Sequence, residues 1–216
     1  VFDRIHPMFE QRSFIVLNIV RLVTCLAIPV LLADPMMSVA LLLIVACVSI
    51  LISFRNFFGT DGSDQMIVIV YVSLLVYASS ANALVRDSAV AFLGGQCILS
   101  YVSAGIAKAV SPVWRDGLAL RRIFSTETYG VAVVRKTLSL LPQSVNVALC
   151  WTVILVESLF FLVVFAPWQV CLIFLAWGLV FHLVNAVAMG LNTCFWAFPA
   201  AYPAVLLLNH WLAIKP

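Results

Sequence analysis

The sequence predicts an all-α fold, a polytopic transmembrane helical bundle with about seven spans, and three observations lead to this prediction. Hydrophobic residues make up 64% of the 216 residues and charged residues only 10%, whereas about a quarter of the residues of a soluble domain are charged. The mean hydropathy is +1.14. The apolar residues are gathered into runs of about 20, the length that an α-helix needs to cross a bilayer.

Seven segments have this length and composition, at least marginally. The predicted spans are Ser13 to Ala33, Met36 to Ser53, Met66 to Leu84, Ala89 to Val110, Val145 to Ala166, Val170 to Leu191 and Cys194 to Ile214. The last contains Pro199 and Pro203, which kink or break a helix unless neighbours bind the freed carbonyl groups. Whether this seventh segment crosses completely is therefore left open.

A longer segment, Ser111 to Ser144, separates the fourth and fifth predicted spans. Arginines and a lysine alternate in it with leucines, valines and an isoleucine. A combination of basic and apolar faces is typical of helices that lie in the plane of the membrane interface. An ordinary solvated loop is the alternative.

The basic residues are distributed unevenly between the two sides of the predicted bundle. One side receives only Arg86 and Lys215. The other receives Arg4, Arg12, Arg55, Arg115, Arg121, Arg122, Arg135 and Lys136. Because basic loops normally face the cytoplasm, we expect the N-terminus and the Ser111 to Ser144 segment to lie on the cytoplasmic side. Basic loops against anionic membrane lipid also explain the pI of about 8.6, so no nucleic-acid partner is predicted.

Several common classes of active site are excluded by the motifs. No G-x-S-x-G, H-E-x-x-H or G-x-x-x-x-G-K-[ST] pattern occurs, which argues against a serine hydrolase, a zinc protease and a phosphate-binding loop. The cysteines lie in apolar runs without a CxxC pair, so they are predicted to pack and no metal site is expected. The "LGGQC" stretch predicts close helix packing through Gly94 and Gly95.

Four ionisable side chains lie within predicted spans, namely Arg21, Lys108, Glu157 and His182. A charge at membrane depth costs about 3 kcal/mol or more, so it normally faces the bundle interior with a partner and marks a functional site. For Arg21 and Glu157 the alternative is an ion pair that only fixes helix packing.

Polar residues of the sixth predicted span share one helical face. His182 and Asn185 are three residues apart, and Met189 follows on the same face, which predicts a polar seam. The alternative is that His182 and Asn185 only form hydrogen bonds with neighbouring helices.

Lys108 lies near the end of the fourth predicted span. A lysine away from water loses its proton easily, and the neutral amine can then act as a base. The alternative is a side chain that extends to the lipid headgroups from the helix end, about one turn before Pro112. On residue chemistry alone, this second arrangement is favoured.

The connection between the second and third predicted spans contains Asp61, Gly62 and Asp64. Asp-Gly is typical of a tight turn, and Asp64 is placed to cap the following helix. The connection is too short for a calcium-binding loop. We predict a turn first, and a ligand site at Asp61 and Asp64 second.

Four stretches together resemble one family. They are "SFIVLNIVRLVTCLAI", "YVSAGIAKAVSPVWRDG", "VESLFFLVVFAP" and "GLVFHLVNAVAMGLNTCFW". Their order and spacing are similar to those of the horizontally transferred transmembrane (HTTM) family, which is related to the membrane part of vitamin K-dependent gamma-carboxylase. The second stretch resembles the family pattern Y-x-x-AG-x-x-K followed by W-x-x-G, which adds Trp114 to the candidate site.

The resemblance implies a role for Lys108 and a fold for the whole chain. It aligns Lys108 with the lysine regarded as the base that deprotonates vitamin K hydroquinone, which suggests a lipid quinone as a cofactor. It also implies a single transmembrane domain over residues 1–216, compatible with a piece of a longer chain. No soluble carboxylase-type domain is expected, and the spacing from Lys108 to Trp114 is about one residue longer than in the family. The chain is therefore more similar to small relatives such as the membrane protein that matures a sporulation-delaying toxin.

The sequence thus leads to one main hypothesis and several rivals. The chain modifies or matures a secreted peptide together with a partner protein. Lys108 accepts a proton in an intramembrane polar cavity, His182 donates or orients, and Arg21 pairs with Glu157 or holds an anion. Rivals are a non-catalytic subunit or scaffold, a carboxylase-like enzyme that uses a quinone, and a small transporter or lipid-binding protein. The sequence leaves open whether the chain is an enzyme.

Overall fold

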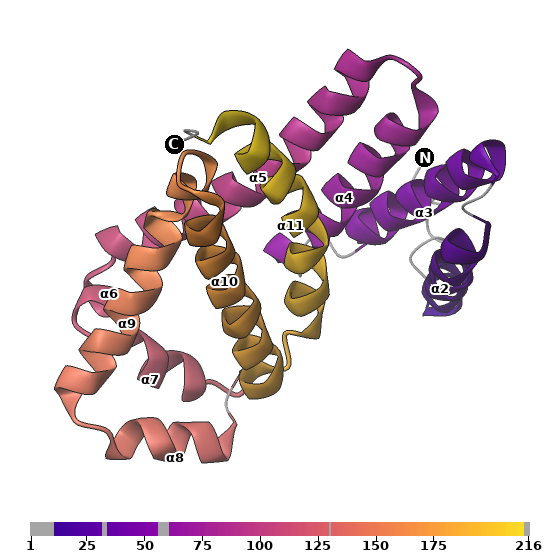
Figure 1. The fold of residues 1–216 in the computed structure, drawn as a ribbon. Helices are drawn as coiled ribbons and strands as arrows, with labels where there is room; N and C mark the ends of the chain where they lie inside the picture. Colours follow the sequence, from indigo (N-terminus) through magenta and orange to yellow (C-terminus); the bar gives the residue numbers. More distant parts are fainter. Residues whose placement is uncertain (1–10, 32–33, 56–60, 130, 214–216) are drawn as a thin grey trace. The chain divides into compact units, whose positions relative to one another are not determined.

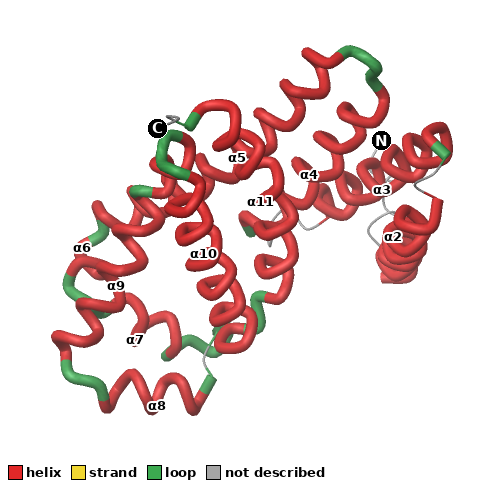
Figure 2. The backbone as a smooth tube through the Cα atoms, viewed as in Figure 1, coloured by secondary structure: helices red, strands yellow, loops and turns green. Residues whose placement is uncertain are grey.

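The computed structural model describes residues 11–31, 34–55, 61–129 and 131–213. All regular elements within these ranges are helices, joined by short loops (Figure 2), so the all-α prediction is confirmed for the described chain. Five of its helices are long and apolar enough to cross a membrane, and a sixth is added if one bent helix pair counts as a span. These helices indicate an integral membrane protein, while the predicted count of seven spans is not confirmed. Of the basic residues used to orient the bundle, Arg4 and Lys215 lie outside the described residues.

The chain divides into two compact units, Val1–Leu93 and Gly94–Pro216. The first unit contains α2 (Gln11–Leu31), α3 (Pro35–Arg55), α4 (Gly62–Ser79) and the beginning of α5 (Ala83–Val110). Helix α3 packs against both α2 and α4 (Figure 1).

Three boundaries of the first unit differ from the predicted spans by four residues or more, one being the end of α4 at Ser79 rather than at Leu84. Helix α4 begins at Gly62 rather than at Met66, because Asp61 caps it. Helix α5 begins at Ala83, so Arg86, which was predicted to lie in a loop, is helical.

The second unit contains the rest of α5 and the elements that follow it. These are α6 (Pro112–Arg115), α7 (Ala119–Phe124), α8 (Ala132–Leu140), α9 (Gln143–Ser158), the 3₁₀ helix η2 (Phe160–Val164), α10 (Trp168–Met189) and α11 (Asn192–Leu212). Three short helices, α6 to α8, thus form in the segment predicted to be interfacial, and the solvated-loop alternative is wrong. Their placement in a membrane interface stays a prediction.

The fifth predicted span is broken into two helical pieces. Helix α9 ends at Ser158, and the chain continues as η2 up to Val164. The changed backbone leaves carbonyl groups to be satisfied from outside the helix, and Asn209 of α11 supplies the donors. Its Nδ2 donates to the carbonyl oxygens of Val163 at 2.6 Å and Ala166 at 2.8 Å. Before the break, the chain bends by 117° between α8 and α9.

Helices α10 and α11 pack against each other and against η2. Gly190 ends α10 with a positive φ of 75°, a conformation that glycine adopts without strain. Helix α11 runs through Pro199 and Pro203 without interruption, so the predicted break does not occur. It is not among the five helices that are long and apolar enough to cross a membrane.

Close packing through glycine occurs at one of the two predicted positions. A Cβ atom on Gly94 would lie 2.9 Å from the carbonyl oxygen of Ala204, whereas a Cβ atom on Gly95 would meet nothing within 4 Å. The prediction is thus confirmed for Gly94 and wrong for Gly95.

The cysteines are free thiols. Cys97, Cys150 and Cys171 have no exposed surface, as expected of packing residues, while Cys47 is exposed on α3.

Candidate functional site

Lys108 and Glu157 form a buried ion pair between α5 and α9. The Nζ atom of Lys108 lies 2.6 Å from Oε2 of Glu157, and the two side chains are 19% and 3% exposed. Nζ also approaches the carbonyl oxygen of Ala104 at 3.4 Å. The predicted extension of Lys108 toward the lipid headgroups is therefore wrong, because its charge is held inside the unit by a carboxylate.

Gly105 allows the two helices to approach closely enough for this pair. A Cβ atom on Gly105 would lie 2.3 Å from the backbone nitrogen of Ser158 and 2.7 Å from the carbonyl carbon of Glu157. Any larger residue would push α5 and α9 apart at this point. Gly105 and Lys108 are one turn apart on the same helical face, so the glycine positions the lysine beside its partner.

Trp114 of α6 covers the other side of the lysine. The Nζ atom of Lys108 lies 5.3 Å from the centre of the Trp114 ring, within the range of a cation–π interaction. A turn links the two residues, because Ser111 donates its backbone N–H to the Lys108 carbonyl at 3.1 Å and accepts from the Trp114 N–H at 3.1 Å. Lys108 is thus held between an aromatic face and a carboxylate.

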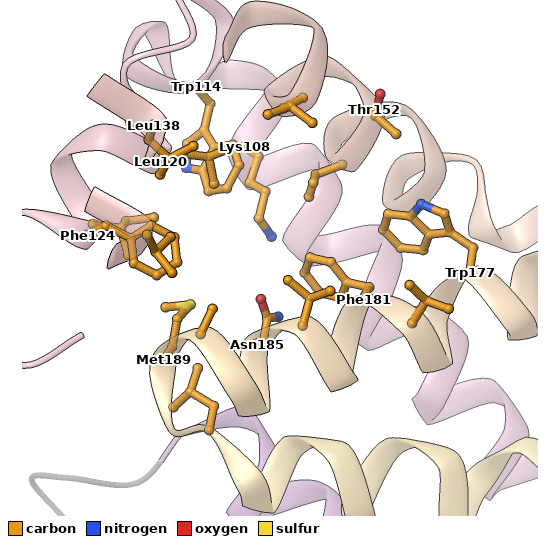
Figure 3. A pocket seen from close by; sticks show the side chains of 18 residues that line it. Lys108, Trp114, Leu120, Phe124, Leu138, Thr152, Trp177, Phe181, Asn185 and Met189 are labelled. Atoms are coloured by element: carbon orange, nitrogen blue, oxygen red, sulfur yellow. The ribbon is translucent and has the colours of Figure 1, made fainter. Parts of the chain in front are cut away.

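A pocket of about 530 Å³ opens next to this lysine. Figure 3 shows that Lys108 and Asn185 point into it from different helices, while Trp114, Phe124, Trp177 and other apolar side chains form most of the wall. The remaining labelled lining residues are Leu120, Leu138, Thr152, Phe181 and Met189. The predicted polar cavity is therefore an apolar pocket with a few polar groups on its wall.

The wall of the pocket comes partly from the short helices α7 and α8. Arg121 of α7 holds the end of α8, because its Nε donates to the Leu138 carbonyl at 3.1 Å and its terminal nitrogen donates to the Leu141 carbonyl at 2.6 Å. Asn146 of α9 is buried and approaches the same two carbonyl groups, each at 3.4 Å. The last carbonyls of α8 are thereby satisfied, which fixes α7 and α8 over the pocket.

His182 belongs to a different polar cluster. Its Nε2 atom lies 2.8 Å from the hydroxyl oxygen of Tyr101, which in turn lies 2.7 Å from the hydroxyl oxygen of Tyr202. The His182 ring stacks on Phe198 with centroids 4.5 Å apart. All three polar residues are buried, and the Nδ1 atom of His182 has no hydrogen-bond partner within the described chain.

The hydroxyl groups of this cluster need a glycine opposite them. A Cβ atom on Gly178 of α10 would lie 2.4 Å from the Tyr202 hydroxyl and 2.8 Å from the Tyr101 hydroxyl. Neither tyrosine was predicted to belong to the site. Tyr101 belongs to the Y-x-x-AG-x-x-K stretch, and its spacing of seven residues from Lys108 was the one available signal.

The shared face predicted on α10 is divided between the two sites. Asn185 and Met189 line the pocket, but His182 is not part of its wall. Residues three apart on a helix differ in direction by about 60°, and here that difference turns His182 toward the tyrosines. The prediction of one seam through His182 and Asn185 is wrong.

Arg21 lies in the first unit and has a partner on its own helix. Its terminal nitrogen donates to Oδ1 of Asn18 at 3.1 Å, and Asn18 donates to the carbonyl of Phe14 at 2.8 Å. The ion-pair partner that the structure gives Glu157 within its own unit is Lys108.

Asp61 and Asp64 form a capping box at the beginning of α4. Asp61 accepts from the backbone nitrogen of Asp64 at 3.2 Å and from that of Ser63 at 2.9 Å, and it also accepts from the Ser63 hydroxyl. Asp64 accepts from the Asp61 backbone at 3.4 Å. Asp61 is thus the N-cap and Asp64 completes the box, while Gly62 already belongs to the helix and residues 56–60 of the predicted turn lie outside the described residues. The capping bonds engage the carboxylates that were considered for a ligand.

Within the described ranges, no group of three or more His, Cys, Asp and Glu side chains is placed to hold a metal ion. Comparison of the chain with protein-family models, with curated proteins and with solved structures found no match.

Proposed function

We propose that this chain is an integral membrane protein of the HTTM type, in a bacterial cytoplasmic membrane with its N-terminus inside. In this proposal it acts with a partner protein to modify or mature a secreted peptide. The reacting centre is the Lys108–Glu157 pair, which moves a proton to or from an apolar molecule bound in the adjoining pocket.

One observation carries the proposal. A titratable pair that only joins helices would be enclosed by other side chains, but Lys108 is part of the wall of a pocket of about 530 Å³. That volume is within the range of sites for small molecules, which are mostly apolar with a few oriented polar groups. Asn185 faces the same space (Figure 3) and can orient a ligand by a hydrogen bond.

The pair has the chemistry of a proton carrier. The Nζ atom of Lys108 donates a hydrogen bond to Oε2 of Glu157, 2.6 Å away, and the proposal is that a proton passes along this bond. When the lysine gives its proton to the carboxylate, it becomes a neutral amine without exchange with bulk water. The original hypothesis of a lone basic lysine is thereby changed to a base that works as one half of a pair.

The pocket also fits a lipid quinone. Trp114, Phe124, Trp177 and Phe181 offer flat apolar surfaces, and Lys108 offers the one charged group among the described residues of the wall. A bound hydroquinone would supply a weakly acidic ring hydroxyl as the proton donor. In this arrangement the aromatic residues hold the ring, the neutral amine of Lys108 accepts the proton, Glu157 keeps the proton that the lysine gave up, and the new ammonium group faces the deprotonated ring oxygen.

The same observations also support a second function, in which the chain catalyses no reaction. A buried pair between two helices, with Gly105 packed against the partner backbone, also stabilises a non-catalytic subunit that binds other membrane proteins. In that case Lys108 is needed for folding and for nothing else.

The binding step is tested with a short-chain naphthoquinone added to the purified chain in lipid nanodiscs. Trp114 and Trp177 line the pocket, so saturable quenching of tryptophan fluorescence is expected. Lys108→Met should weaken binding by about tenfold, the value of one charge-assisted hydrogen bond. Trp177→Phe should reduce the amplitude of quenching. Linear quenching without saturation, or equal affinity in Lys108→Met, contradicts the proposed site.

The maturation step is tested in cells that secrete the peptide. Mass spectra of secreted peptides are compared between cells that produce the natural chain and cells that produce Lys108→Met at equal membrane abundance. The proposal expects one modified or processed peptide to disappear in the variant. An unchanged peptide pattern at normal abundance favours the non-catalytic subunit.

A further inference from the structure

A second pocket, of about 370 Å³, lies within the first unit. It is bordered by the last turn of α2, the first turn of α3 and the connection between α4 and α5. Its lining residues are Ile28, Pro35, Ser38, Leu42, Leu74, Tyr77, Ala78, Ser80 and Arg86. In a protein whose helices cross a membrane, connections between spans lie at the level of the lipid headgroups. The pocket therefore combines an apolar wall with a position near lipid phosphates.

Arg86 provides a positive charge that the described chain does not neutralise. Its guanidinium carbon lies 4.2 Å from the centre of the Tyr77 ring, and one terminal nitrogen donates to the Tyr77 hydroxyl at 2.6 Å. The only ion pair among the described residues is Lys108–Glu157. A guanidinium has five N–H donors, so most of those on Arg86 are available to an anion.

Two hydroxyl groups of the same pocket are also placed to donate. The Tyr77 oxygen accepts from Arg86, and the Ser80 oxygen accepts from the backbone nitrogen of Asn82 at 3.1 Å. Each therefore has its own hydrogen for a further acceptor. Ser38 differs, because its hydroxyl donates to the Leu31 carbonyl at 3.3 Å.

The nearby acidic residues do not occupy this cluster of donors. Asp34 accepts from the backbone nitrogens of Met36 and Met37 at 2.9 and 3.2 Å and so caps α3. Asp87 is exposed, and neither aspartate lines the pocket. The positive charge and the donors of the pocket therefore complement an anion with several acceptor oxygens.

We propose that this pocket binds an anionic phospholipid. Its phosphate accepts from Arg86, Tyr77 and Ser80, and one acyl chain lies along Ile28, Leu42 and Leu74. Arginine is suited to this role because its planar guanidinium binds two phosphate oxygens at once, and the tyrosine ring holds it in place. This site shares no lining residue with the Lys108 pocket and does not depend on the proposed function.

The test is native mass spectrometry of the full chain in detergent, titrated with phosphatidylglycerol or phosphatidylcholine of the same acyl length. The chain should retain phosphatidylglycerol at least about tenfold more tightly, and Arg86→Gln should abolish this preference. Arg135→Gln is the matched control, because Arg135 is exposed on α8 and lines neither pocket. It should keep the preference of the natural chain.

Two further measurements separate a lipid from a free anion. Ala78 lies at an exposed position on the pocket wall. Ala78→Trp should fill the space for the acyl chain and weaken the binding of phosphatidylglycerol, while Arg86 stays in place. Inorganic phosphate should not displace the lipid. Equal retention of both lipids by the natural chain, an unchanged preference in Arg86→Gln, or displacement by inorganic phosphate overturns the proposal. Circular dichroism checks that the variants are folded.

Discussion

Gly105 contacts the backbone of Ser158 so closely that a methyl group on its Cα atom would lie 2.3 Å from the Ser158 nitrogen. This contact fixes the separation of α5 and α9 one turn before Lys108 meets Glu157. The ion pair thus depends on a residue without a side chain, and the contact leads to the first prediction.

Gly105→Ala should destabilise the protein by about 1–3 kcal/mol, the usual cost of overpacking a close contact. It should also separate Lys108 from Glu157 and weaken quinone binding. Gly95→Ala is the matched control on the same helix, because a Cβ atom there meets nothing within 4 Å. Alanine is the better helix former, so this control should be neutral or stabilising by up to about 1 kcal/mol. Thermal unfolding in detergent measures both changes, and equal effects would contradict the contact.

Lys108 and Glu157 should show strong coupling in a double-mutant cycle. Removing one partner leaves the other charge buried, which costs about 3–5 kcal/mol. Glu157 is 3% exposed and Lys108 is 19% exposed, so Lys108→Met should cost more than Glu157→Leu. The double variant Lys108→Met, Glu157→Leu should recover much of the lost stability. Additive losses in unfolding experiments would show that the two side chains do not interact.

Tyr101→Phe should destabilise the protein by more than Tyr202→Phe does. The Tyr101 hydroxyl forms hydrogen bonds with both His182 and Tyr202. Its removal leaves two buried polar groups without this partner, and each such group costs about 1–3 kcal/mol of stability. Tyr202→Phe removes only one of these bonds. The difference between the two melting temperatures is the measurement, and a reversed order would contradict the central position of Tyr101.

Asp61 should tolerate replacement by a residue that caps a helix equally well. Asp61→Ala removes the acceptor for the backbone nitrogens of Ser63 and Asp64 and should cost about 0.5–2 kcal/mol. Asp61→Asn keeps a side-chain oxygen and should be close to neutral. Thermal unfolding separates the two variants. A large loss in Asp61→Asn would show that the negative charge has a role beyond the cap.

The helical membrane fold could be predicted because long apolar runs leave a chain few other structures. Boundaries were less predictable, since they depend on single contacts. Asp61 moves the beginning of α4 to Gly62. Asn209 binds the carbonyl groups of Val163 and Ala166, so it supports the break after α9, and a residue more than 40 positions away in the sequence gives no local signal.

The candidate site was predicted in part. Lys108, Glu157 and Asn185 were selected because polar groups are unusual at membrane depth, and Trp114 was added by the family resemblance. The structure brings all four into contact with the pair or its pocket.

The partners of these residues were not predictable, because they depend on helix rotation. His182 is directed to Tyr101 rather than to the pocket, and a change of about one residue in the register of α10 would reverse that choice. The importance of Gly105 was also missed, since a glycine has no chemistry of its own.

The end of α9 at Ser158 adds an electrostatic property to the site. The last carbonyl groups of an α-helix carry a partial negative charge, and the ammonium group of Lys108 binds the side chain of Glu157, one residue before this end. A cation is therefore favoured beside this terminus even when Glu157 has taken up a proton. The terminus acts as a permanent counter-charge, so the centre can pass through different states of protonation without requiring an ion from solution.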